Sequence, residues 1–319
     1  EIPVPRLSEN QILIKTEFSL VSAGTERMLV DFGKGNLLDK AKQQPDKVKE
    51  VINKAKTDGV FSTIEAVNYK LNEPLPLGYC NVGKIIELGK RVKNFKLGDR
   101  VVSNGAHAEI VAVSEKLCAN IPPNVESIDA AFTVLGSIGL QGIRLAKPSL
   151  GEVFVVSGLG LIGLLTAQLL IAQGCIVFGI DPDKNRCNIA KKFGIKTFHL
   201  DKESDPVSWC LKENKGIGID GVLITATTSS NEPLEVAAKI CRKRGRIILI
   251  GVTGMDLRRD LFYKKELSFQ VSCSYGPGRY DPKYENDCED YPLGFVRWTE
   301  QRNFQAVLQT LASGKLIVK

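Results

Sequence analysis

The sequence predicts an α/β protein with a strand-rich first third and a doubly wound parallel sheet in the remainder. Three strand-like runs with turn signals between them occupy residues 11–21, 82–92 and 99–113. From about residue 130, short Val/Ile-rich runs alternate with helical segments, which is typical of a parallel sheet covered on both faces. At 319 residues, with 43% apolar and 25% charged residues, the chain is long enough for two domains with separate cores.

One helical block interrupts the strand-rich first third. Residues 40–56 are polar but carry apolar residues at helical spacing, and Pro45 is expected near the start of the helix. The block fits either a surface helix or a lid over a pocket. Gly98 and Asp99 separate two of the strand-like runs, as a hairpin connection would.

In the second part, apolar runs and helical segments follow one another regularly. The expected strands are 153–157, 175–181, 196–200, 221–226, 246–252 and 267–273. The expected helices are 163–173, 183–193, 205–213 and 232–243. Six strands connected by helices predict one parallel sheet.

Charge and cysteine usage argue against several classes of protein. The net charge of +7 is mild, and the one basic run, 239–246, is expected to end a helix, without the interleaved aromatic residues of nucleic-acid sites. Eight cysteines occur without a C-x-x-C pair, so we expect neither a structural zinc lobe nor a disulfide framework, but free thiols in the cytoplasm. No apolar run approaches the ~20 residues that a membrane span needs.

A glycine-rich loop follows the strand at 153–157 directly. Its sequence is GLGLIG, from Gly158 through Gly160, Leu161 and Ile162 to Gly163, and it opens an apolar helix. In this setting the first glycine permits a tight turn, the second permits backbone to approach a pyrophosphate, and the third lets the helix pack on its strand. The alternative, a glycine-rich turn without a ligand, is the weaker interpretation. We therefore predict a dinucleotide-binding loop.

The end of the next strand bears on the choice between NAD and NADP. Asp181 is placed to accept both ribose hydroxyls and to repel a 2′-phosphate, which favours NAD. Lys184 and Arg186 follow closely and weaken that preference, so NADP is not excluded.

The chain as a whole resembles the medium-chain dehydrogenase/reductase superfamily. The segments SLVSAGTE, PLGYCNVGKIIELGKRVKNFKLGDRV, HAEIVAV, VLGSIGLQGIR, GLGLIG and GRIILIGV occur in the order of that superfamily. The resemblance implies a GroES-like catalytic domain at 1–125, completed by 314–319. It also implies a Rossmann domain at 126–313, with the nicotinamide in the cleft between the two domains.

The resemblance also indicates that the chain lacks the catalytic zinc. Zinc-dependent members carry metal ligands at the positions of Ala23, Tyr79 and Ser137, and none of these three residues is a normal zinc ligand. The only histidines, His107 and His199, lie at other positions. We expect no metal site.

Within the superfamily, residues 19–48 and 296–303 are most similar to a zinc-less branch that resembles bacteriochlorophyllide dehydrogenases. Many members of this branch form the front half of bi-domain oxidoreductases associated with surface-polysaccharide gene sets. The chain begins without Met and stops where relatives return to the catalytic domain. We therefore expect a longer natural protein with a fused second oxidoreductase domain.

Without a metal, a hydrogen-bond donor has to handle the charge on the substrate oxygen. Tyr79 is the best candidate, because a phenol is protonated at neutral pH; the alternative is that it only packs in the cleft. Thr25 and Glu26 lie beside another vacated ligand position. By resemblance, Gln141 reaches the nicotinamide carboxamide, and Gly251 and Val252 contact the nicotinamide through backbone groups.

The remaining residues of interest fall into two groups. Cys80 has no activating neighbour, His107 fits a packed histidine or a proton relay, and His199 has no functional case. The segment 274–303 is rich in aromatic and basic residues and is expected to form a long ordered loop. In it, Tyr275, Arg279 and Arg297 are candidate substrate contacts, while the rival interpretation is a subunit contact in a homodimer.

The sequence thus favours a zinc-independent NAD(P)-dependent oxidoreductase. Its expected substrate is a polar or anionic small molecule, such as a nucleotide-linked sugar or polysaccharide precursor. The alternative is a cofactor-binding module without independent catalysis, within a longer bi-domain protein. Nucleic-acid binding has little support, and no membrane association is expected.

Overall fold

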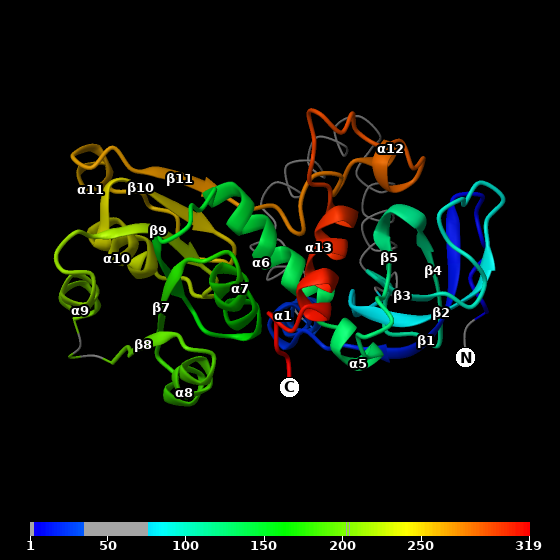
Figure 1. Cartoon of the computed structure of the whole chain (residues 1–319), viewed down its shortest axis with the longest axis horizontal. Coiled ribbons are helices and arrows are strands. Elements are labelled where there is room, and N and C mark those ends of the chain that lie inside the picture. The colour runs from blue at the N-terminus through cyan, green and yellow to red at the C-terminus, as the bar shows by residue number, and fades with distance from the viewer. Residues whose placement is uncertain (1–2, 35–75, 202, 204) are drawn as a thin grey trace, which may run out of the picture.

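The computed structural model describes residues 3–34, 76–201, 203 and 205–319. The helical block predicted at 40–56 lies outside the described residues. The described chain forms two sheets, with helices α6 and α13 between them (Figure 1). This mixed α/β arrangement confirms the predicted fold class.

The first sheet is antiparallel and has the order β4-β1-β2-β3-β5. Its strands are β1 Gln11–Ser19, β2 Asn81–Leu88, β3 Arg100–Ser103, β4 Ile110–Ser114 and β5 Cys118–Asn120. Ile12, Ile14, Ile85 and Val101 fill its core. The predicted run 99–113 divides into β3 and β4, because residues 104–109 leave the sheet as a loop that carries His107.

The second sheet is parallel and has the order β11-β10-β9-β6-β7-β8. Its strands are β6 Val153–Ser157, β7 Ile176–Asp181, β8 Lys196–His199, β9 Ile219–Ile224, β10 Cys241–Leu249 and β11 Ser268–Val271. The central strand β6 is buried along most of its length. All six strands overlap predicted runs, and β6, β7 and β9 are the mostly buried, apolar strands expected of a sheet covered on both faces.

Four predicted helices connect these strands. They are α7 Leu161–Ala172, α8 Lys184–Lys192, α9 Pro206–Glu213 and α10 Glu232–Ile240. The expectation that the basic run 239–246 ends a helix is correct only for Lys239. Helix α10 ends at Ile240, and the other basic residues occupy the irregular first half of β10, where the strand register shifts between Cys241 and Arg246.

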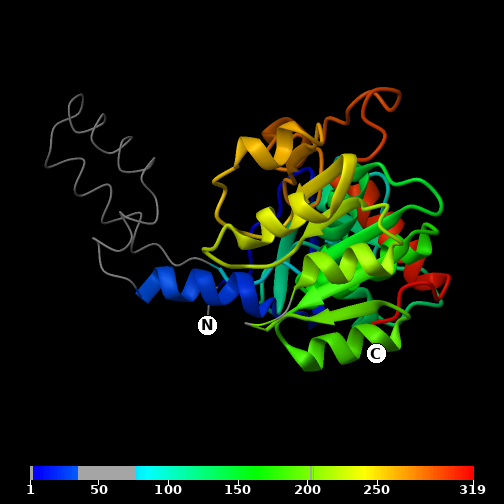
Figure 2. The same cartoon turned by 90° about the vertical axis from the view of Figure 1, so that its left-hand side faces the viewer.

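Several helices were not predicted. The longer ones are α1 Ala23–Lys34, α6 Thr133–Ala146 and α13 Glu300–Ala312, and the shorter ones are α5 Ser127–Ala130, η1 Glu115–Leu117, α11 Arg259–Tyr263 and α12 Pro282–Glu285. Two glycines of α6 allow neighbouring elements to pack closely against the helix. A Cβ on Gly136 would lie 2.9 Å from Val307 of α13, and a Cβ on Gly142 would overlap Ile250. Helix α6 therefore packs against both α13 and the end of β10. Figure 2 shows α1, in blue, extending outward from the body of the molecule.

The last residues of the chain contact both halves of the molecule. The backbone N–H and carbonyl of Ile317 pair with the side chain of Gln168 on α7, and Lys319 pairs with Glu126 and Asp129 beside α5. The predicted domain bounds, including the return of 314–319 to the first domain, stay a prediction. None of the helices in the described ranges is long and apolar enough to cross a membrane.

Candidate active site

The glycine-rich loop adopts a turn that only glycine accommodates at two positions. Gly158 has a φ of 97°, and a Cβ there would lie 2.7 Å from the backbone nitrogen of Ala226. A Cβ on Gly163 would overlap the carbonyl oxygen of Gly158. A Cβ on Gly160, by contrast, would have as its nearest neighbour a guanidinium nitrogen of Arg186 at 3.9 Å. The loop is thus tightly packed at its ends and open in the middle, where a ligand would approach.

Two further loops meet the glycine-rich loop at the carboxyl end of the parallel sheet. Thr225, after β9, donates a hydrogen bond of 2.6 Å to the carbonyl of Gly158. After β10, a Cβ on Gly251 would overlap the carbonyl oxygen of Ala226, and Val252 forms a bridge with Thr227. The predicted cofactor residues Gly251 and Val252 therefore lie beside the loop that follows β9, which in turn contacts the glycine-rich loop.

The start of helix α7 adds hydrogen-bond donors to this edge. Gly160 is the residue before the helix, and Leu161, Ile162 and Gly163 form its first turn. The first N–H groups of a helix have no partner within it and lie at the positive end of its dipole. Backbone donors and an open glycine in one place are the arrangement that binds a pyrophosphate.

Asp181 lies at the end of β7 and is almost completely buried. Its two carboxylate oxygens accept backbone N–H bonds from Leu159 at 2.6 Å and Asp183 at 2.7 Å. Arg186 of α8 lies 3.8 Å away, whereas Lys184 is exposed. Asp181 thus fixes the shape of the glycine-rich loop, and a cation lies next to the place where it would meet a ribose.

Tyr79 and Thr25 are brought together, although 54 residues separate them in the chain. The Tyr79 hydroxyl donates to Thr25 Oγ1 at 3.3 Å. Burial raises the pKa of Tyr79, and hydrogen bonds with Ser22 and Thr25 only partly offset this effect. The phenol therefore remains protonated at neutral pH and is available as a donor.

Glu26 lies in the first turn of α1 and is hydrogen-bonded to His107. One Glu26 oxygen accepts the Ser22 backbone N–H at 2.7 Å, and the other lies 2.9 Å from His107 Nε2. The other ring nitrogen of His107 lies 2.9 Å from Oγ of Ser19, an exposed residue. Among the described residues, a chain of polar groups thus leads from the surface at Ser19 to Glu26, beside Tyr79.

Gly78 explains why the imidazole of His107 fits against this segment. A Cβ on Gly78 would lie 2.6 Å from the ring of His107, and the backbone N–H of His107 donates to Leu77 at 2.8 Å. The glycine before Tyr79 therefore makes room for His107. From the sequence, His107 fitted either a packed histidine or a proton relay. The segment HAEIVAV indicated where His107 lies in the family pattern but not that Glu26 is its partner.

The residues at the zinc positions of the family do not fit a zinc ion. Ala23 offers no donor atom, and Ser137 Oγ bonds the carbonyl of Thr133 within α6. Tyr79 would bind a metal as a phenolate, which its raised pKa opposes. Within the described ranges, no group of three His, Cys, Asp or Glu side chains is placed to hold a metal ion.

Gln141 lies on α6 and is buried against the segment that follows β11. Its amide oxygen lies 3.5 Å from Asn303 Nδ2, and a Cβ on Gly276 would lie 2.9 Å from the same oxygen. Asn303 also donates to the carbonyl of Tyr275 at 2.8 Å. In this structure Gln141 therefore holds two elements together, and its predicted contact with a carboxamide stays a prediction.

The segment 274–303 is ordered, as expected, but it is not a loop throughout, because it contains α12 and the start of α13. Tyr275 is 3% exposed, packs on Phe304 and accepts a hydrogen bond from Asn104. Burial raises its pKa. Tyr275 is therefore part of the core and offers no exposed ring face, contrary to its prediction as a substrate contact.

The two arginines of this segment have separate partners. Arg279 forms an ion pair with Glu285, whereas Arg297 lies over the Trp298 ring at 4.0 Å. Arg144 covers the same ring at 3.4 Å, and burial lowers the pKa of Arg144 to about 10. Arg279 is thus paired within the chain, whereas the exposed Arg297 keeps its N–H donors, and its predicted contact with the substrate stays a prediction.

Cys80 and His199 have the minor roles that the sequence indicated. Cys80 is completely buried, and burial raises the pKa of its thiol well above its ordinary value, which opposes a nucleophilic role. A ring nitrogen of His199 lies 3.0 Å from the carbonyl oxygen of Pro182, a local contact away from the Tyr79 cluster. Thr225, Ser22 and Asn104 were missed, because nothing in their local sequence distinguishes them from ordinary polar residues.

Two protein families match the two halves of the chain. The alcohol dehydrogenase GroES-like domain family matches residues 52–141, and the zinc-binding dehydrogenase family matches residues 162–286. An alcohol dehydrogenase of Moraxella sp. (strain TAE123) is 25% identical over 272 residues, covering 74% of this chain and 79% of the relative. A D-guloside 3-dehydrogenase of Escherichia coli (strain K12) is 29% identical over 251 residues, covering 75% and 67%.

Solved structures share the same fold. The crystal structure of galactitol-1-phosphate dehydrogenase from Escherichia coli superimposes with a TM-score of 0.72 at 18% identity. The match covers the whole of this chain and 86% of that chain.

Proposed function

Given that the chain belongs to the medium-chain dehydrogenase/reductase superfamily and is an NAD(P)-dependent oxidoreductase of that type, we propose that it works without zinc on a polar or anionic sugar derivative. One observation carries the zinc-independent part. At the positions of the missing ligands, a half-buried phenol donates to Thr25 beside the hydrogen-bonded Glu26 and His107.

The residues that hold the cofactor in this proposal line the carboxyl edge of the parallel sheet. Gly158, Gly160 and the first turn of α7 bind the pyrophosphate, and Gly251 and Val252 face the nicotinamide. Asp181 favours NAD as the cofactor, and the neighbouring Arg186 leaves NADP possible. When bound, a nicotinamide cofactor supplies or accepts the hydride, which protein side chains cannot do.

Tyr79 carries the proton chemistry in this proposal. Its hydroxyl donates to the substrate oxygen, which develops negative charge during carbonyl reduction, and thereby replaces the polarising effect of a metal. In this step the Thr25 hydroxyl turns to donate to the phenol oxygen, because the single phenolic proton, which bonds Thr25 Oγ1 in the structure, goes to the substrate. The carboxylate of Glu26 opposes formation of a phenolate, so it keeps the proton on Tyr79 until the substrate takes it.

The proposed substrate class is supported by the names of similar enzymes and by the polar side chains of the candidate site. The relatives above include enzymes named for a guloside and for galactitol 1-phosphate. Hydroxyl-rich substrates are compatible with Thr25, Tyr79 and Asn104, which offer hydrogen-bond donors and acceptors. We also propose that the protein forms a homodimer, that it is located in the cytoplasm, and that it is fused to a second oxidoreductase domain.

The experiment combines binding and turnover. NAD and NADP binding is measured by calorimetry, and reduction of a panel of keto sugars and keto glycosides by NADH and NADPH is followed with and without a chelator. We expect binding of at least one cofactor and chelator-resistant turnover that Tyr79→Phe abolishes while cofactor affinity stays unchanged. Stoichiometric zinc in the purified protein would contradict zinc independence, and cofactor binding without turnover of any substrate would favour the cofactor-binding module.

A further inference from the structure

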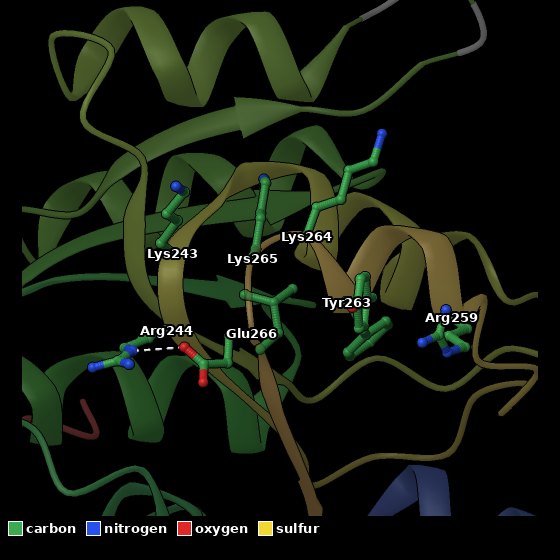
Figure 3. A pocket seen from close by; sticks show the side chains of 9 residues that line it. Lys243, Arg244, Arg259, Tyr263, Lys264, Lys265 and Glu266 are labelled. Carbon is green, nitrogen blue, oxygen red and sulfur yellow. Dashed lines mark hydrogen bonds and ion pairs between the residues drawn. The ribbon is translucent and has the colours of Figure 1, made fainter.

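A second pocket lies at the opposite end of the parallel sheet from the glycine-rich loop. Its volume is about 810 Å³, and its lining comes from the start of β10, helix α11 and the turn before β11 (Figure 3). Strand β10 runs parallel to β9, which runs parallel to β6. The first residues of β10 are therefore remote from the loop that follows the last residue of β6.

The pocket is strongly cationic. Its charged lining consists of Lys243, Arg244, Arg259, Lys264, Lys265 and a single carboxylate, Glu266. Figure 3 shows the three lysine side chains extending in the same direction, with Arg244 joined to Glu266. The one acidic group is thus already paired, at 2.7 Å, and does not neutralise the lysines.

The backbone around the pocket is held in an unusual conformation. Arg244 and Glu266 have φ values of 60° and 53°, in the left-handed region that non-glycine residues rarely adopt. The Arg244 N–H donates to the Lys265 carbonyl at 2.7 Å, which ties the start of β10 to the turn before β11. Such conformations persist where the surrounding structure enforces them, so the rim of the pocket is formed before any ligand arrives.

The lysines of the pocket differ in their partners. Lys265 donates to the carbonyls of Ala238, Lys239 and Cys241 at the end of α10, at 3.0, 2.6 and 2.7 Å. The side chains of Lys243 and Lys264 are exposed and make no hydrogen bond or ion pair in the described chain. Arg259 lies 4.2 Å over the ring of Tyr263, which is 68% exposed. Three cations and an aromatic platform are therefore available to a ligand.

We propose that this pocket binds a small oligophosphate. Its volume is that of a small-molecule site, and adjacent ammonium and guanidinium groups are the usual partners of phosphate oxygens. Several negative charges on one ligand satisfy Lys243, Lys264 and Arg259 together. The site is independent of the dehydrogenase chemistry and of the glycine-rich loop.

The direct test measures binding of sodium tripolyphosphate to the full chain by calorimetry at physiological ionic strength. The variant Lys243→Gln/Lys264→Gln removes the two unpaired cations, and Lys191→Gln/Lys192→Gln, at the exposed end of α8, removes the same charge elsewhere. We expect the pocket variant to bind at least about tenfold more weakly, and the control to stay within about twofold of the wild type.

Three results would overturn the proposal. They are no binding to the wild type, equal weakening in the pocket variant and the control, and loss of tripolyphosphate binding when NAD is present in excess. The last result would place the phosphates at the glycine-rich loop. NAD binding itself is measured in the same variants and is expected to be unchanged, so failure here is distinguishable from failure of the proposed oxidoreductase function.

The same assay distinguishes a bare oligophosphate from a nucleotide. Adenosine triphosphate is titrated against the wild type, the Lys243→Gln/Lys264→Gln variant and Tyr263→Ala. Tighter binding than tripolyphosphate that Tyr263→Ala removes, with the lysine dependence retained, identifies a nucleoside phosphate. Equal binding that Tyr263→Ala leaves unchanged identifies the phosphate chain alone as the recognised group.

Discussion

The glycine-rich loop and the Tyr79 cluster form two halves of one candidate site but are built differently. The loop depends on backbone: Gly158, Gly163 and Gly251 leave no room for a side chain. The Tyr79 cluster depends on side chains from three separate segments, in which Tyr79 meets Thr25, and Glu26 meets His107. The comparison teaches that a backbone site is readable from a short motif, whereas a side-chain site exists only after the fold is formed.

The largest expected effect is at Gly158. Gly158→Ala adds a Cβ 2.7 Å from the Ala226 nitrogen at a φ of 97°, so both strain and overlap oppose it. We expect a loss of about 3 kcal/mol in the free energy of unfolding and a fall in dinucleotide affinity of about 100-fold or more. Urea denaturation and calorimetry measure the two effects.

Gly151→Ala is the matched control for this change. Gly151 has a φ of 83°, but a Cβ there meets no atom within 4 Å. We expect it to cost about 1 kcal/mol and to leave dinucleotide binding unchanged. Equal effects of the two substitutions would show that strain alone, and not close approach, explains the glycine at 158.

Glu300 is a buried carboxyl group outside the candidate site, and unlike Glu26 it has no hydrogen-bond partners in the described structure. Glu300, at the start of α13, is completely buried, and neither of its oxygens has a hydrogen-bond partner in the described structure. Burial raises its pKa to about 9. Above its unfolded pKa of about 4.5, the unfolded chain loses this proton while the folded chain keeps it until about pH 9, so stability falls as pH rises between these values.

We therefore expect Glu300→Gln to flatten the pH dependence of stability. The free energy of unfolding of the wild type should fall by about 2–3 kcal/mol more than that of the variant between pH 5 and pH 8. Urea denaturation at several pH values measures this difference. Parallel curves for the two proteins would contradict the assignment of a neutral carboxyl group to Glu300.

Glu26 differs from Glu300 because both of its carboxylate oxygens have hydrogen-bond partners. Glu26→Gln weakens the hydrogen bonds to His107 and to the Ser22 N–H, so we expect a loss of about 1–3 kcal/mol in the free energy of unfolding. His107→Gln, which retains an amide donor, should cost less. If Glu26→Gln is neutral, the hydrogen bond between Glu26 and His107 does not organise the side-chain half of the site.

The smallest expected change in stability is that of Tyr79→Phe. It removes one hydrogen bond of 3.3 Å in a half-buried position, so we expect at most about 1 kcal/mol. If Tyr79→Phe loses turnover but keeps its cofactor affinity, the glycine-rich loop and the Tyr79 cluster act separately. A fall in cofactor affinity equal to that of Gly158→Ala would show that they do not.

Some features of the site could be predicted from sequence and others could not. The loop Gly158–Gly163 and the position of Asp181 follow from local spacing, because a strand, a turn and a helix of fixed lengths leave few alternatives. The pairing of Glu26 with His107 spans 81 residues and depends on how the loop 104–109 returns to α1. Arg279 was expected to face a ligand, but its ion pair with Glu285 could not be foreseen from residue types alone.

The sequence by itself determined the alternation of strands and helices and the position of the glycine-rich loop. These properties are local, since hydrophobic periodicity, glycine spacing and residue type act over a few neighbours. Only the tertiary structure decided that His107 faces Glu26, that Tyr275 is buried and that several cations surround one pocket. These properties depend on how segments meet in space: His107 reaches Glu26 across 81 residues, and Tyr275 packs against Phe304 of α13.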